Sequence, residues 1–261
     1  MPDLTTPAPY APTMTSDSAV ERTQHLARVG SFLRAAVLFL ALTAVYEVSR
    51  YLVAPDVPSV PLRHARGVIS FERALGLFVE PRFQSAVDAL PAVRTLTVWI
   101  YSYEHLVGSI AFLIWLWLMR PLQFPFVWRW FWIAHVLALV GFWLYPLAPP
   151  RLLPELNLAD PTAAQLASSP GASLFSHIRN DFAAMPSLHV GYPLIFATVI
   201  WFTLPHTRMR WLVWLWPVTL AVVVMATANH YWLDSVGGAL TVGAALVISV
   251  ALFRHLPRPW T

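Results

Sequence analysis

Four long stretches of this chain contain no Asp, Glu, Lys or Arg, and this feature limits the available folds more than any other. The stretches are Trp130–Pro150, Phe182–Thr207, Trp211–Leu233 and Ser235–Phe253. A helix that crosses the hydrocarbon core of a bilayer needs about 20 predominantly apolar residues. Charged residues make up only 11% of the sequence, whereas about 25% is usual in soluble domains. The sequence therefore predicts an integral membrane protein.

The apolar runs predict an all-α bundle of six transmembrane helices. The six predicted spans are Phe32–Val53, Leu96–Met119, Phe124–Leu147, Ser187–Leu204, Trp211–Ala228 and Leu233–Phe253. The first contains Glu47 and Arg50, which are three residues apart and can pair near the membrane interface. The second contains Glu104 and His105, which are unfavourable in lipid unless they face a polar interior.

The remaining segments predict the domain organisation. Residues 1–30 are expected to form a disordered N-terminal tail, because the start is rich in Pro, Thr and Ala and lacks the apolar core of a signal peptide. Residues 31–255 are expected to form the membrane domain, and residues 256–261 a C-terminal tail.

The connection after the first span contains an amphipathic segment, Ala65–Glu80. One predicted face carries Val68, Phe71, Leu75 and Phe78, while Arg66, Glu72, Arg73 and Glu80 lie mostly off this stripe. This pattern predicts an amphipathic helix lying in the membrane interface. A helix packed on the bundle is the alternative.

Arginine placement predicts the orientation in the membrane. The connections after the second and fourth spans and the C-terminal tail contain arginines and no acids, whereas both long connections mix the two signs. The positive-inside rule then places the termini in the cytoplasm, and we expect a multi-pass protein of the plasma membrane. With six spans, Arg151, His189 and His230 meet on the opposite, outer face.

His230 and Asp234 are four residues apart at the start of the last span and share one helical face. A carboxylate there can accept the Nδ1 hydrogen, which leaves Nε2 unprotonated and able to act as a nucleophile. The alternatives are a buried structural pair and a metal site, although few further ligands are evident. No metal or cofactor is expected.

Further polar residues are candidates for the same site. His189 follows Pro186 and Ser187 at the start of the fourth span, where free backbone N–H groups favour an anion and a histidine can protonate a leaving oxygen. Arg151 follows two prolines and can bind phosphate oxygens in pairs, or it is an interfacial arginine. Residues that could line the pocket around them are Tyr101, Glu104, His105, Arg179 and Asn229.

These residue types favour phosphoryl transfer from a lipid, since two histidines can supply a nucleophile and an acid on opposite sides of phosphorus. The modest, scattered net charge of +4 argues against a nucleic-acid partner, and the absence of cysteine excludes disulfides and thiolate metal sites. The alternative function is a transporter or channel with intramembrane polar residues.

The chain resembles the type 2 phosphatidic acid phosphatase superfamily of lipid phosphatases, whose soluble relatives include vanadium haloperoxidases. The resemblance rests on three motifs and is closer to the branch of inositol phosphorylceramide synthase-like phosphotransferases. The motifs are Pro149–Arg151, Ala183–His189 and Asn229–Gly238. The resemblance implies a six-helix membrane core and a lipid phosphate or phospholipid substrate, with water or an alcohol or polyol as acceptor.

The resemblance also implies roles for individual residues. His230 would form a phosphohistidine, Asp234 would orient it and His189 would be the general acid, while Arg151 and Ser187 would hold the phosphate. The chain departs from the family pattern where the third-motif arginine and the first-motif lysine are replaced, near Val224 and Leu144, and where Leu188 replaces a glycine. Arg179 is the predicted substitute for the missing cation.

Overall fold

The computed structural model describes residues 16–163, 180–204 and 208–253, with side chains from Gly30 onward. The predicted phosphate ligand Arg179, the whole predicted C-terminal tail and the first half of the N-terminal tail lie outside these ranges. The chain divides into two compact units, Met1–Val45 and Tyr46–Thr261. All the site residues described below belong to the second unit.

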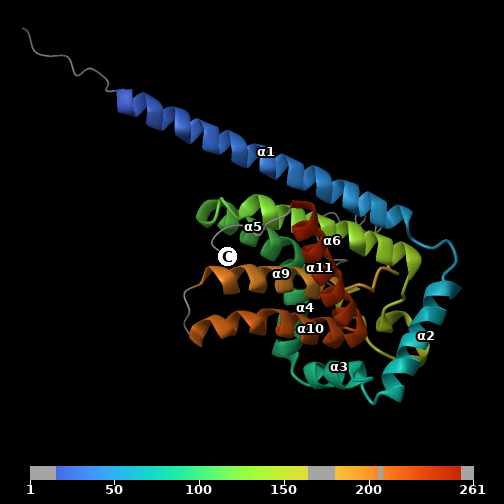
Figure 1. Ribbon diagram of the computed structural model, residues 1–261. Helices are drawn as coiled ribbons and strands as arrows, with labels where there is room; N and C mark the ends of the chain where they lie inside the picture. Colours follow the sequence, from blue (N-terminus) through green and yellow to red (C-terminus); the bar gives the residue numbers. More distant parts are fainter. Residues whose placement is uncertain (1–15, 164–179, 205–207, 254–261) are drawn as a thin grey trace, which may run out of the picture. The chain divides into compact units, whose positions relative to one another are not determined.

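The described residues form helices and no strands, which confirms the all-α prediction. Figure 1 shows the helices in sequence order. Their bounds are α1 Ser16–Leu52, α2 Ser59–Ala74, α3 Glu80–Asp88, α4 Pro91–Tyr103, the π-helix η1 Glu104–Gly108, α5 Ser109–Met119, α6 Phe124–Leu144, the 3-10 turns η2 Pro150–Leu152 and η3 Pro154–Leu156, α9 Leu188–Thr203, the 3-10 helix η4 Arg208–Trp214, α10 Leu215–Ala226 and α11 Trp232–Phe253. Helix α1 begins at Ser16, inside the segment predicted as a disordered tail.

Five helical segments of the described chain are long and apolar enough to cross a membrane. They are Gly30–Leu52, Pro91–Met119, Phe124–Leu144, Arg208–Ala226 and Trp232–Phe253. The remaining predicted span is present as α9, which has 16 residues and is therefore about 24 Å long, shorter than a hydrocarbon core of about 30 Å. The chain is thus a helical multi-pass membrane protein, and the count of six spans stays a prediction.

Helix α9 is the central element of the second unit, because it packs against both α10 and α11. Figure 1 shows α9 and α10 running side by side. Ile195 and Phe196 of α9 are completely buried. Trp130 of α6 donates a 2.8 Å hydrogen bond from Nε1 to the carbonyl oxygen of Val242 in α11. These contacts fix the positions of α9 and α11, at whose beginnings His189 and Asp234 lie.

The predicted amphipathic segment Ala65–Glu80 is helical only in part, because α2 ends at Ala74 and α3 begins at Glu80. The buried face of α2 includes Ala65, Val68, Ile69 and Glu72, and these apolar residues pack on Leu147, Ala148 and Tyr231. Phe71 and Leu75, which belong to the predicted apolar stripe, are 51% and 52% exposed. The predicted stripe is therefore not the face that packs on the protein, since large apolar side chains of a membrane protein can face lipid as readily as the interior. The position of this segment in the membrane interface stays a prediction.

Candidate active site

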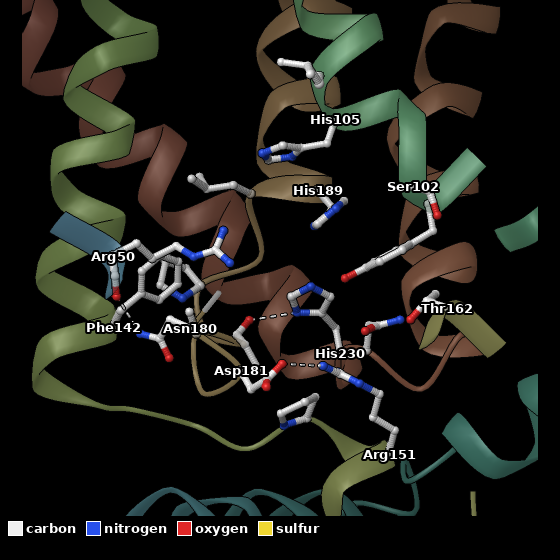
Figure 2. A pocket seen from close by; sticks show the side chains of 18 of the residues that line it. Arg50, Ser102, His105, Phe142, Arg151, Thr162, Asn180, Asp181, His189 and His230 are labelled. Carbon is white, nitrogen blue, oxygen red and sulfur yellow. Dashed lines mark hydrogen bonds and ion pairs between the residues drawn. The ribbon is translucent and has the colours of Figure 1, made fainter. Parts of the chain in front are cut away.

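A cavity of about 350 Å³ in the second unit brings the three sequence motifs together. Six of the predicted site residues line it, namely Tyr101, His105, Arg151, His189, Asn229 and His230. Figure 2 shows His105, Arg151, His189 and His230 pointing into this cavity from different segments. The convergence of Arg151, His189 and His230, which was expected from the number of spans, is therefore present in the fold.

His230 lies just before α11, and its hydrogen bonds fix its tautomer. Its Nδ1 is 2.8 Å from the carbonyl oxygen of Ala184 and 3.2 Å from Oδ2 of Asp234. A carbonyl oxygen can only accept, so Nδ1 carries the hydrogen and Nε2 of the neutral ring keeps its lone pair. Burial lowers the pKa of His230 to about 3; the Ala184 bond opposes this shift, and the positive charges of Arg151 and Arg50 add to it. The ring is therefore neutral near pH 7.

Asp234 is completely buried and holds the start of α11 as well as the imidazole. Its Oδ2 also accepts a 3.0 Å hydrogen bond from the backbone N–H of Tyr231. The backbone carbonyl of Asp234 accepts the N–H of Ser187 at 3.0 Å. The segment around Asp234 thus links the second motif to the third, in addition to orienting His230.

His189 lies in the first turn of α9, opposite His230. The centroids of the two rings are 5.6 Å apart, and the ring planes are inclined by 57°. Tyr101 stacks on His189 at 4.5 Å, and His105 lies at the same centroid distance. The two rings therefore border one space small enough for a single phosphoryl group to reach both.

The wall that carries Tyr101 and His105 contains a π-helical turn, Glu104–Gly108. Such turns occur frequently at functional sites because they change the direction in which side chains project. His105 faces the cavity, whereas Glu104 does not line it; Oε1 of Glu104 accepts a 2.9 Å hydrogen bond from Trp216.

Arg151 reaches the cavity but is already paired with two carboxylates. Its Nε lies 3.0 Å from Asp160, and its Nη2 lies 3.2 Å from Asp181. Burial would raise the pKa of Asp160, but hydrogen bonds from Thr162 and the charge of Arg151 outweigh it and lower the pKa. The Arg151 guanidinium is therefore largely neutralised before any ligand binds.

The other two predicted residues differ in their exposure to the cavity. Ser187 is the N-cap residue of α9, but its side chain makes no capping bond, is fully buried and does not line the cavity. Asn229 lines the cavity and donates from Nδ2 to the carbonyl of Thr227 at 3.1 Å. Among the described residues, no group of three or more His, Cys, Asp or Glu side chains is arranged to hold a metal ion.

Two buried carboxyl groups that the sequence analysis missed hold the start of α11. Glu80 Oε1 accepts the backbone N–H of Trp232 at 2.8 Å, and Glu72 Oε1 accepts that of Leu233 at 3.2 Å. Both side chains are completely buried. They satisfy N–H groups that lack partners at a helix start. The spacing of Glu72 from Val68 and Ile69 would have placed it on their face.

Replacing Glu72 with glutamine is expected to flatten the pH dependence of stability. Burial and the neighbouring Glu80 carboxyl raise the pKa of Glu72 above its ordinary value. The folded protein then binds more protons than the unfolded chain, so the free energy of unfolding falls as pH rises through the neutral range. Glutamine removes this slope, up to about 1.4 kcal/mol per pH unit for one proton, and keeps an acceptor for Leu233.

The measurement is the thermal midpoint of both proteins in detergent at pH values from about 5 to about 8. The difference between the two curves isolates Glu72 from the other titrating groups. Parallel curves would mean that Glu72 is ionised in the folded protein.

The fold and the cavity together define a helical membrane protein in which three histidines and two arginines line one cavity. A comparison with protein families gives the family directly. Residues 66–248 match the PAP2 superfamily, and the chain belongs to this superfamily of phosphatases and phosphotransferases. No curated protein matches the chain, and no solved structure does.

Proposed function

We propose that this protein is a lipid phosphatase or lipid head-group phosphotransferase that works through a covalent phosphohistidine on His230. The observation that carries the proposal is the pair of rings, His230 and His189, on one cavity, with Nε2 of His230 unprotonated. Membership of the PAP2 superfamily supports an enzyme of this general class.

In the first step, Nε2 of His230 attacks phosphorus, and a P–N bond forms as the bond to the leaving oxygen breaks. The leaving oxygen takes a proton from His189, whose protonated form is favoured by the negative charge of the bound phosphate. Asp234 and the Ala184 carbonyl stabilise the positive charge that develops on the His230 ring.

In the second step, an acceptor hydroxyl gives its proton to His189 and attacks phosphorus, and the P–N bond breaks. Water as the acceptor makes the protein a phosphatase; an alcohol or polyol makes it a transferase. The motif resemblance favours transfer of a head group. The cavity, at about 350 Å³, has room for more than a phosphate group, which also suits a head group or a polyol acceptor.

The lipid substrate is proposed from the position of the site. The cavity lies at the beginnings of α9 and α11, where apolar helices start, so a phosphate there can remain attached to a lipid chain. We further propose that this face is the outer side of the plasma membrane, with both termini in the cytoplasm, as the arginine distribution predicts.

The test is a screen of the purified protein with labelled phosphatidic acid, prenyl phosphates and phosphoinositides, each with and without polyol acceptors. Released phosphate identifies a phosphatase, and a labelled acceptor identifies a transferase. Vanadate, which resembles the five-coordinate phosphorus, is expected to inhibit. Absence of turnover on every phosphate, combined with substrate flux in liposomes, would instead favour a transporter.

A further inference from the structure

Among the described residues, the charged groups around Arg151 supply too little positive charge to balance a bound phosphate. A phosphate monoester carries up to two negative charges near neutral pH, and Arg151 is already shared by Asp160 and Asp181. These three groups together carry a net negative charge. The positions near Leu144 and Val224, where the family places further cations, are apolar. A second cation is therefore needed.

Arg50 lies where this cation is needed. It is in the last turn of α1 and lines the same cavity as His189 and His230. Figure 2 shows its side chain running across the cavity wall toward the two histidines. Its charge contributes to the lowered pKa of His230, as does that of Arg151, so both cations lie within electrostatic reach of the nucleophile.

The guanidinium of Arg50 has hydrogen-bonding capacity to spare. Its Nη1 lies 3.4 Å from Oε2 of Glu47. Its Nε is buried and has no hydrogen-bond partner among the described residues. An unsatisfied buried donor is unfavourable, and the edge formed by Nε and Nη2 has the geometry that binds two phosphate oxygens at once.

The fold holds Arg50 by its backbone and leaves the side chain for a ligand. Asn180 donates from Nδ2 to the carbonyl oxygen of Arg50 at 2.8 Å, and its Oδ1 accepts the N–H of Phe182 at 2.9 Å. The segment that carries Asp181 is thus tied to the end of α1 by the side chain of Asn180 and the main-chain oxygen of Arg50. A substitution of the Arg50 side chain leaves this tie intact.

We propose that Arg50 is a phosphate-binding residue of this site and supplies the cation that the family motifs lack here. The assignment rests on the proposed function and adds a ligand from the first span, outside the three motifs. Glu47 holds the unliganded guanidinium, and the phosphate binds the opposite edge.

Three variants test the assignment by calorimetric titration of inorganic phosphate and vanadate into protein in detergent, with kcat and KM measured on the best lipid substrate. Arg50→Gln is expected to weaken anion binding by ~100-fold, since it removes a charge-assisted pair of bonds. Arg50→Lys keeps the positive charge but cannot bind two phosphate oxygens in parallel. Its anion affinity is expected to lie between that of the wild type and that of Arg50→Gln. Arg66→Gln is the control, because Arg66 forms an exposed pair with Glu155 outside the cavity.

Glu47→Gln is expected to change the anion affinity in the opposite direction. It releases Nη1 of Arg50 from a competing carboxylate and is expected to tighten phosphate binding by up to ~5-fold, which a purely structural ion pair would not do. An active wild type with unchanged anion affinity in both Arg50→Gln and Glu47→Gln would overturn the assignment of Arg50 alone. A wild type that neither binds vanadate nor turns over any lipid phosphate would overturn the proposed function with it.

Discussion

Replacing His230 with alanine is expected to lower turnover by ~10⁴-fold or more, the usual effect of losing a covalent nucleophile. The reason is that, of the described residues lining the cavity, His230 is the one whose Nδ1–H is fixed by two acceptors, the Ala184 carbonyl and Asp234, which leaves Nε2 free to attack. The measurement is kcat on the best lipid phosphate, together with trapping of a labelled, acid-labile phosphoenzyme.

Two further variants separate chemistry from folding. His135→Ala removes another buried histidine, which hydrogen-bonds to Phe131 and Tyr192 and does not line the cavity. This variant is expected to form the phosphoenzyme as the wild type does. His189→Ala is expected to lose much less activity on a substrate with a good leaving group, since His189 is needed to protonate a poor one. A phosphoenzyme that still forms in His230→Ala would exclude His230 as the nucleophile.

The sequence alone was sufficient to predict five of the apolar spans and the convergence of the motifs. Runs without charges predict membrane helices because an unpaired charge in lipid is unfavourable, and the helices α6, α10 and α11 begin and end close to the predicted bounds. Arg151, His189 and His230 were expected on one face from the number of spans, and they line one cavity.

The contact between His230 and Asp234 was expected from their spacing. The Ala184 carbonyl that binds His230 and the carboxylates that pair with Arg151 could not be predicted, because no local spacing marks them as partners. Arg151 pairs with Asp160 and Asp181, which are 9 and 30 residues further along the chain. Glu72 was missed for a second reason. The solvent around a membrane helix is itself apolar, so a stripe of large hydrophobic side chains does not identify the buried face, and small residues such as Ala65 mark it better.

Gly238 is the position where the smallest change is expected to disturb the site most. A Cβ atom there would lie 2.2 Å from the carbonyl oxygen of Ser187 and 3.1 Å from its carbonyl carbon. These are backbone atoms at the start of α9, and the N–H of Ser187 is bonded to the carbonyl of Asp234. They cannot move away without separating α9 from α11, and therefore His189 from His230.

Gly238→Ala is therefore expected to destabilise the fold by ~1–3 kcal/mol through overpacking and to lower kcat by ~10²-fold through displacement of the two rings by about 1 Å. Gly243→Ala is the matched control on the same helix, because its Cβ would meet nothing within 4 Å. That variant is expected to be neutral or stabilising by up to about 1 kcal/mol, as alanine is the better helix former. The measurements are the thermal midpoint and kcat of both variants. If Gly238→Ala matched Gly243→Ala in both, the contact between the second and third motifs would not hold the histidines in register.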